Sequence, residues 1–341
     1  MADEDRPALV IGASGFLGGH VVRALAARGR EIRILARPTS DLSGLDGLRY
    51  DKRAGDLADP ASLREAVPGC GTVFHCAVDT RAWLTDPAPL YRTNVDGLVN
   101  SAEAALEANV SRFVYTSTVG TIGLNARRPV TEDDAFNWYE RAPHYLRSRA
   151  DGEAKLFGYC RDRGLPGVAL CVANTYGPDD RQPTPHGELL WQAARGRLPF
   201  VLKAGVPWVD VRDAAEALLL AEEKGEIGTR YIVAGGHATQ VELHALAARV
   251  LGERPPRSLP PWTAQLAAQV NHLLCRARGL RDQRLCPDSI TLAKIFGPLD
   301  ATRAREELGW RPRPLEESVR DAVLWFAGHH RQGGPSGPDG T

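Results

Sequence analysis

The sequence predicts an α/β protein with a doubly wound parallel sheet and a smaller lobe after it. Short apolar segments alternate with helical patterns through the first half of the chain, which is typical of strands and covering helices in a parallel sheet. The segments are almost continuously apolar, as expected when both sheet faces are buried. A glycine-rich turn, Gly12 to Gly18, directly follows the first segment.

The predicted elements of the first half alternate in order along the chain. We expect strands at 8–11, 32–36, 71–76, 112–117 and 168–173, a further strand ending before Asp56, and helices at 17–27, 90–108 and 145–160. After about residue 175 the regularity fades. Loops rich in Pro and Gly, at 177–187 and 196–207, alternate there with predicted helices at 211–224, 240–251 and 315–326.

Composition narrows the function classes. With 341 residues, 43% apolar and 25% charged, the chain has enough material for one large or two closely joined domains. Its 42 basic and 42 acidic residues give no net charge, so we expect no nucleic-acid partner. The basic residues are 37 arginines and only five lysines.

The termini, cysteines and apolar stretches predict a cytoplasmic protein. The first residues are acidic and polar, unlike a secretory signal. The six cysteines are scattered without a C-x-x-C pair, so we expect neither disulfides nor a metal site. No stretch is long enough to span a membrane. The nearest candidate, 259–274, reads as an amphipathic helix whose apolar face packs inside, on a second subunit or on a membrane surface.

The glycine-rich turn predicts a dinucleotide site. Gly12, Gly15 and Gly18 lie between a strand and a helix, where glycines permit the tight turn, the approach of a pyrophosphate and close helix packing. We expect Ser14, Phe16 and Leu17 to line the same site. The alternative is a glycine turn that binds nothing.

The end of the second strand favours NADP(H), with NAD(H) as the alternative. The segment from Leu35 to Ser40 has no acid that would bind a ribose diol, and Arg37 can pair with a 2′-phosphate. Otherwise Arg37 stacks on the adenine or lies in solvent. Asp56 and Leu57 are placed to meet the adenine, although Asp56 could instead cap a helix starting at Pro60.

Further motifs carry a family resemblance. In order they are Gly55-Asp56-Leu57, Asp79-Thr80-Arg81-Ala82-Trp83, Tyr91 to Gly97, Val114 to Thr118, Pro183-Thr184-Pro185, Arg195 to Pro199 and Val209 to Asp213. With the glycine turn, they make the chain resemble the extended short-chain dehydrogenases/reductases of the NAD-dependent epimerase/dehydratase family. Within these it is most similar to the dihydroflavonol 4-reductase-like, hopanoid-associated sugar epimerase group, from about Ala8 to Phe326.

The resemblance implies a Rossmann-type sheet with a C-terminal substrate-binding lobe. The dinucleotide-binding domain would be mainly 1–175 and the lobe mainly 176–330, with some elements returning to the core, and 331–341 would be a disordered tail. It implies catalysis by Tyr145 and Thr118, with Ser117 beside Thr118. The further implied cofactor contacts are Cys76, Ala77, Val78, Asn94, Tyr145, Arg149, Val172 and Asn174.

Two positions depart from the family pattern. The family's Tyr-x-x-x-Lys pair becomes Tyr145 and Arg149, and none of the eight tyrosines has a lysine four residues later. Either Arg149 keeps the electrostatic role, or the site performs a reaction without net redox change, such as epimerisation or dehydration, or the fold binds nucleotide without catalysis. Val172 stands where the family usually has proline, beside the nicotinamide.

The leading functional prediction is an NADPH-dependent reductase of a carbonyl in a small organic or sugar-derived substrate. The alternatives are a nucleotide-sugar epimerase or dehydratase with tightly bound NAD(P), and a non-catalytic NAD(P) sensor. Related folds dimerise through helices corresponding to 90–108 and 145–160, so a homodimer is a further expectation. The candidate substrate-contacting residues are Thr80, Trp83, Thr184, His186 and Trp208, although aromatic residues there also serve as packing.

Overall fold

A seven-stranded parallel sheet forms the centre of the protein. The computed structural model describes residues 6–277 and 286–331. The expected tail at 331–341 therefore lies outside the described residues, apart from Arg331. The strands are β1 (Ala8–Ile11), β2 (Ile32–Ala36), β3 (Asp51–Ala54), β4 (Thr72–His75), β5 (Arg112–Thr118), β6 (Gly167–Val172) and β10 (Arg230–Val233). Their order is β10-β6-β5-β4-β1-β2-β3, and all six pairings are parallel. The predicted doubly wound α/β sheet is confirmed.

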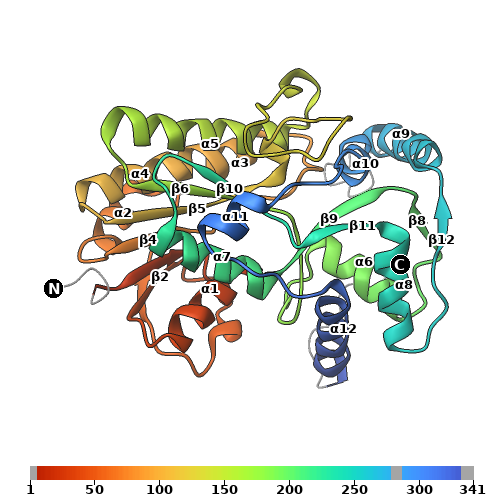
Figure 1. Ribbon diagram of the computed structural model, residues 1–341, viewed down its shortest axis with the longest axis horizontal. Helices are drawn as coiled ribbons and strands as arrows, with labels where there is room; N and C mark the ends of the chain where they lie inside the picture. Colours follow the sequence, from red (N-terminus) through yellow and green to blue (C-terminus); the bar gives the residue numbers. More distant parts are fainter. Residues whose placement is uncertain (1–5, 278–285, 332–341) are drawn as a thin grey trace.

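Helices cover both faces of this sheet (Figure 1). One face carries α1 (Phe16–Ala27) and α7 (Val211–Lys224), which pack on each other; the other carries α2 (Pro60–Ala66), α4 (Gly97–Glu107) and α5 (His144–Arg163). Strand β5 shows how the apolar residues of one strand, Phe113 to Tyr115, serve both faces of the sheet. Val114 belongs to the apolar core under α1 and α7, whereas Phe113 and Tyr115 belong to the core under α4 and α5, because successive side chains point to opposite faces.

The second half of the chain builds a smaller lobe with its own apolar core. Its sheets are β11 (Gly236–Thr239), β9 (Gly205–Asp210) and β7 (Asn174–Tyr176) in one, and β12 (Arg257–Leu259) with β8 (Phe200–Leu202) in the other. Helices α6 (Pro185–Ala194), α8 (Gln240–Val250) and α12 (Leu315–Arg331) pack around Trp191, Trp208 and Phe326. The remaining helices are α3 (Ala88–Tyr91), α9 (Pro261–Ala277), α10 (Pro287–Lys294) and α11 (Thr302–Glu307).

Two late elements lie with the central sheet and not with the lobe. Strand β10 extends the sheet beside β6, and α7 covers the sheet beside α1. The sequence pattern placed 211–224 among the helices of the second half, and its burial against α1 shows that this helix is part of the central sheet layers. The chain therefore crosses between the sheet and the lobe several times, which holds the carboxyl edge of the sheet against the lobe.

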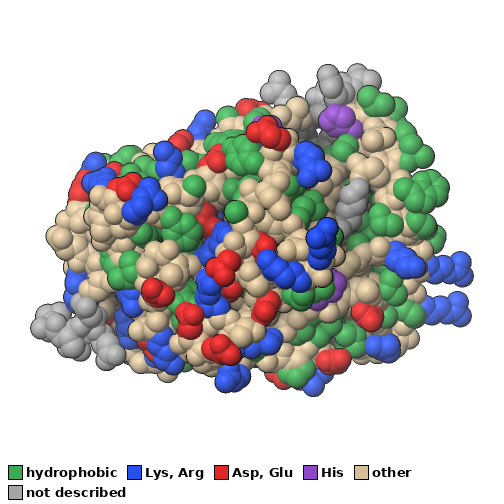
Figure 2. Space-filling model, turned by 45° about the horizontal axis from the view of Figure 1, so that its top comes forward, with side chains coloured by type: hydrophobic (Ala, Val, Ile, Leu, Met, Phe, Trp, Pro, Cys, Tyr) green, Lys and Arg blue, Asp and Glu red, His purple; other side chains and the backbone are tan. Residues whose placement is uncertain are grey.

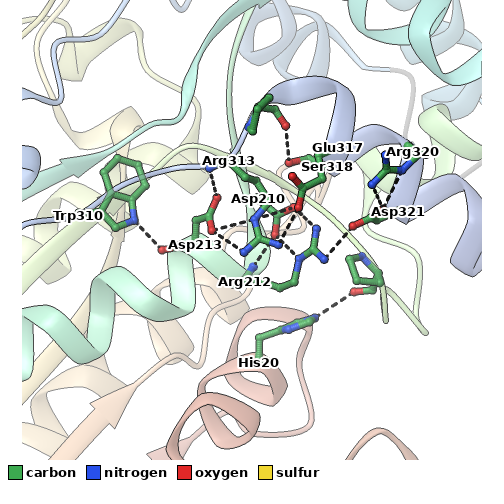
Figure 3. A network of polar contacts seen from close by, with 12 residues as sticks. His20, Asp210, Arg212, Asp213, Trp310, Arg313, Glu317, Ser318, Arg320 and Asp321 are labelled. Carbon is green, nitrogen blue, oxygen red and sulfur yellow. Dashed lines mark hydrogen bonds and ion pairs between the residues drawn. The ribbon is translucent and has the colours of Figure 1, made fainter. Parts of the chain in front are cut away.

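A buried polar network joins α7 to the C-terminal segment (Figure 3). Asp210, which is fully buried, caps the N-terminus of α7 and accepts hydrogen bonds from the backbone and side chain of Arg212 at 2.8–2.9 Å. Arg212 also pairs with Asp321 of α12 at 2.9 Å, and Arg313 donates to Asp213. Burial would raise the pKa of Asp210, but these hydrogen bonds outweigh it and hold the pKa below its ordinary value. The ionised carboxylate thus anchors α12 to the sheet layers.

Candidate active site

The glycine turn between β1 and α1 has the shape of an anion cradle. Gly12 has a φ of +89°, and a Cβ there would lie 2.7 Å from the backbone nitrogen of Ala77. A Cβ on Gly18 would overlap the carbonyl oxygen of Gly12. Gly15 is the N-cap of α1 and supplies no side-chain cap, so the first N–H groups of the helix are open to a ligand. The positive end of the helix dipole favours a pyrophosphate there.

The residues expected around the dinucleotide lie in the glycine turn, in the first turn of α1 and after β2 and β3. Ser14 is exposed, while Phe16 and Leu17 are half-buried in the first turn of α1. Arg37 is exposed one residue beyond β2. The carboxylate of Asp56 accepts from the backbone of Ala58 at 2.9 Å.

The capping alternative for Asp56 is wrong. The N-cap of α2 is Asp59, which accepts from the backbone of Ala61 at 3.0 Å. Leu57 is half-buried and packs against Gly97, where a Cβ would overlap its side chain. Asp56 and Leu57 therefore stay at the edge of the sheet as candidate adenine contacts.

Asn94 connects the loop after β4 to the start of α5. It lies in a π-helical segment, Arg92–Asp96, between α3 and α4, a type of helix defect found frequently at functional sites. Its side chain pairs with both backbone groups of Asp79, at 2.9 and 3.0 Å, and donates to the Ser148 hydroxyl at 3.0 Å. All three are buried. Asn94 therefore positions the neighbouring helix turn, and its side chain is occupied by this role.

The other cofactor candidates near β4 are the three residues that follow His75. Cys76 is buried and its sulfur lies 3.5 Å from the Thr116 hydroxyl; burial raises the pKa of its thiol to about 11. Ala77 is half-buried and borders the glycine turn, and Val78 is exposed. Cys76 thus stays an uncharged thiol that lines the site.

Tyr145 and Arg149 lie one turn apart on α5. Arg149 is only 2% exposed. One guanidinium nitrogen donates to the carbonyl oxygen of Thr116, and the guanidinium carbon lies 5.0 Å from the centre of the Tyr115 ring. The two other nitrogen atoms, Nε and Nη1, contact no hydrogen-bond acceptor among the described residues. Both atoms are closed off from solvent, so they are unpaired polar atoms inside the protein.

The titratable side chains of His75, Tyr115 and Tyr145 around Arg149 are neutral near pH 7. Burial, with help from Arg149, lowers the pKa of His75 to about 3, and burial raises the pKa of Tyr115 to about 12. Both rings are neutral near pH 7. Burial also raises the pKa of Tyr145, Arg149 opposes this effect and Asp79 adds to it. Tyr145 is therefore a protonated phenol at neutral pH.

The two candidate hydroxyls on β5 have different surroundings. Ser117 is buried and donates to Glu153 of α5. Glu153 is held in turn by Thr121 at 2.9 Å and by Arg230 at 2.8 Å. Thr118 accepts from the backbone of Gly120 at 3.2 Å, which leaves its O–H free to donate. Thr118 is thus the better placed of the two to orient a substrate oxygen, and Ser117 fixes α5 on β5.

Val172 and Asn174 lie at the exit of β6. Val172 is buried and ends β6 opposite Thr118, and Asn174 begins β7 opposite Trp208. Trp208 itself packs on Gly235 and Gly236 in the core of the lobe. Its contacts are those of a packing residue.

The remaining substrate candidates divide between the β4 loop and the start of α6. Thr80 is exposed and Trp83 is half-buried in the loop. Thr184 caps α6: its hydroxyl accepts from the backbone of Gly187 at 3.0 Å and donates to Asp180 at 2.8 Å. His186 is half-buried, and burial lowers its pKa to about 4. Thr184 therefore has a helix-capping role, and His186 is neutral near pH 7.

Asp79, Tyr115 and Glu153 contribute to the site without having been among the candidates. The sequence could have predicted a role for Glu153, because this residue follows Arg149 by four residues and so lies on the same face of the helix. No sequence spacing brings Tyr115 under Arg149, since the two lie on different elements. In residues 6–277 and 286–331, no group of three or more His, Cys, Asp or Glu is placed to hold a metal ion, and no helix is long and apolar enough to cross a membrane.

Comparisons with known proteins identify the family and agree with the fold. The model of the NAD dependent epimerase/dehydratase family matches residues 8–234. Sterol demethylase protein B of Methylococcus capsulatus is 33% identical over 320 residues, covering 93% of this chain and 97% of that protein. A putative dihydroflavonol 4-reductase of Synechocystis is 30% identical, covering 94% of each. The crystal structure of gox2253 superposes with a TM-score of 0.85 at 34% identity, covering 96% of this chain and 99% of that one.

Replacing Gly12 by Ala is expected to weaken dinucleotide binding by about tenfold or more, because the new Cβ meets Ala77 and the positive φ is unfavourable. Titration calorimetry with NADP+ and NAD+ measures this change. Gly29→Ala is the matched control, since Gly29 has a φ of +68° but open space around it. It should cost about 1–2 kcal/mol of stability and leave the affinity unchanged. If Gly12→Ala binds the dinucleotides as tightly as the wild type does, the glycine turn is not the pyrophosphate site.

Proposed function

Because the chain belongs to the NAD-dependent epimerase/dehydratase family of NAD(P)-dependent enzymes, we propose that it is an NADPH-dependent reductase of a carbonyl in a small organic or sugar-derived substrate. The observation that carries the proposal is the pair on α5: Tyr145 lies one turn before a buried Arg149, and burial raises the pKa of the phenol, which favours its protonated form. A protonated phenol is the form that carbonyl reduction requires, since the substrate oxygen must gain a proton. Relatives named as a dihydroflavonol reductase, a ketoreductase and a cinnamoyl-CoA reductase support the same direction.

The cofactor, when bound, supplies the hydride to the carbonyl carbon. Tyr145 donates its phenolic proton to the carbonyl oxygen, and Thr118 donates a hydrogen bond to the same oxygen from its free O–H. Both groups stabilise the negative charge that develops there.

Arg149 has two roles in this proposal. Its unpaired Nε and Nη1 would donate to the nicotinamide ribose once the side chain turns toward the cofactor, since both atoms are closed off from solvent. Its charge eases the loss of the Tyr145 proton, because it opposes the rise in pKa that burial causes. A guanidinium does not lose its proton near neutrality. Arg149 therefore takes no part in proton relay, and Tyr145 regains its proton from water.

Arg149 also supports a second candidate function. Lysine can pass on a proton and arginine cannot, so a site with Arg149 also suits an epimerase or dehydratase that recycles a bound NAD(P). Cofactor that remains with the enzyme through purification, with turnover in the absence of added NADPH, would favour this alternative. A requirement for stoichiometric NADPH favours the reductase.

Replacing Tyr145 by Phe should lower kcat for NADPH oxidation by about 10²–10⁴-fold with an aldehyde or ketone substrate, because the proton donor is lost. Cofactor affinity should stay near the wild-type value. Tyr159→Phe is the matched control: Tyr159 lies on the same helix, has Arg163 four residues later and donates to Glu103 at 2.7 Å. Its activity should match the wild type. Full activity in Tyr145→Phe would refute the proposed role.

Replacing Arg37 by Ala should weaken NADPH binding by about tenfold while NADH binding changes little, since only NADPH has a 2′-phosphate for the guanidinium. Fluorescence titration of both reduced cofactors measures the ratio. Arg161→Ala, which removes an exposed arginine at the far end of α5, should leave both affinities unaltered. Equal loss for both cofactors, or a wild-type preference for NADH, would contradict the 2′-phosphate contact.

A further inference from the structure

Helix α9 exposes its large apolar residues. Their exposed fractions lie between 50% and 68%, far above those of core residues. The residues, here named the α9 apolar face, are Trp262, Leu266, Val270, Leu273 and Leu274. At about 100° per residue they fall within an arc of about 120°. They form one continuous stripe along the helix, wider than the scattered single exposures normal on a soluble surface.

The opposite side of α9 is small and polar, and it faces the protein. Ala268 is fully buried there, and Gln265, Asn271 and His272 are each partly buried and engaged in interactions. Helix α10 packs against α9. The amphipathic pattern is therefore reversed relative to an ordinary surface helix, in which the apolar side faces the core. A helix whose apolar side faces outward indicates a surface that binds an apolar partner.

Arginine is the charged residue type in the segment that contains α9. The sequence from Arg254 to Arg281 contains five arginines and no acidic residue. Arg254 and Arg257 are exposed, and Arg257 pairs in β12 with Phe200 of β8, itself 47% exposed. Figure 2 shows hydrophobic side chains gathered along the right-hand edge of the molecule, over α9 and β12, with Lys and Arg side chains next to them.

We propose that the α9 apolar face docks on the surface of an anionic lipid bilayer, with the helix lying in the plane of the interface. Trp and Leu on one face with arginine beside them is the pattern of helices that bind such surfaces, and basic residues near the bilayer are attracted by anionic headgroups. A self-complementary contact with a second copy would need partners of opposite charge at its rim. Between residues 254 and 275 the charged side chains are those of Arg254 and Arg257, which are both basic and exposed.

The docking surface adjoins the candidate active site. Beyond α9, α10 and the residues after it contribute Leu292, Ile295 and Phe296 to the apolar cluster that contains Trp138 and Tyr145. Asp288 of α10 lies within electrostatic reach of both His272 on α9 and His144 on α5. Docking through α9 would therefore bring the tyrosine side of the site near the lipid surface. The inference does not depend on the reaction proposed above.

The test is flotation of the full chain with vesicles of phosphatidylcholine alone and of phosphatidylcholine mixed with phosphatidylglycerol. We expect binding to the anionic vesicles, weaker binding at high salt, and a fall of at least about tenfold in the partition coefficient for Leu266→Glu/Leu273→Glu. The matched control is Ile227→Glu/Leu324→Glu, which changes two apolar residues that are 53% exposed elsewhere. It should bind as the wild type does.

A second variant, Arg254→Glu/Arg257→Glu, keeps the test decisive if the α9 variant does not fold, because it leaves the helix intact. We expect it to reduce binding to anionic vesicles by at least about tenfold. The proposal is overturned if the wild type does not float with anionic vesicles, or if the folded variants float as well as the wild type. It is also overturned if sedimentation velocity shows a dimer that Leu266→Glu/Leu273→Glu dissociates while no vesicles are bound. Cofactor and turnover play no part in these readouts.

Discussion

The burial of the Arg149 guanidinium is the constraint on which the rest of the site depends. Taking a charge out of water is costly unless other groups replace its hydration. Here the Thr116 carbonyl accepts one hydrogen bond and the Tyr115 ring lies 5.0 Å away, as in a cation–π contact. His75, whose pKa is lowered by burial and by Arg149, stays neutral. The remaining nitrogen atoms contact no acceptor among the described residues, so part of the cost of burial is not offset within the protein. In the proposal above, the cofactor ribose would supply the missing acceptors.

The parallel sheet places the other candidate site residues near the buried Arg149. The carboxyl ends of β1, β4 and β5 lie side by side, so the glycine turn, the loop after β4 and Thr118 meet at one edge, as ligand sites do in open α/β sheets. Helix α5 is then fixed over that edge at two points. Asn94 holds its first turn through Ser148, and Glu153 holds its middle through Ser117. Tyr145 lies one turn before the first attachment, and Arg149 lies between the two. The two attachments therefore fix the positions of both residues.

The sequence predicted the elements whose cause is local. Alternating apolar strands and helices, the glycine turn and the four-residue spacing of Tyr145 and Arg149 are all readable from neighbouring residues. Contacts between distant elements were not readable. Ser117 and Thr118 are adjacent, yet only the packing of α5 shows that Ser117 is engaged by Glu153. The capping role of Thr184 was missed, because 177–187 was expected to be a loop whereas α6 begins at Pro185, and the direction of the α9 apolar face was left open. Because the chain has far more arginine than lysine, composition alone could account for an arginine at position 149. The contact between its guanidinium and the Tyr115 ring shows that the side chain has a specific position in the structure.

The central claim is that the site is built around a guanidinium and not around any cation at this position. Arg149→Lys tests it most directly, because lysine keeps the charge but has neither the planar fork nor the stacking surface. Calorimetric titration with NADP+ measures the outcome without requiring the substrate. The account predicts an affinity lower by about tenfold, equivalent to roughly 1.4 kcal/mol, with the fold unchanged. An Arg149→Lys protein that binds NADP+ as tightly as the wild type, or more tightly, would contradict it.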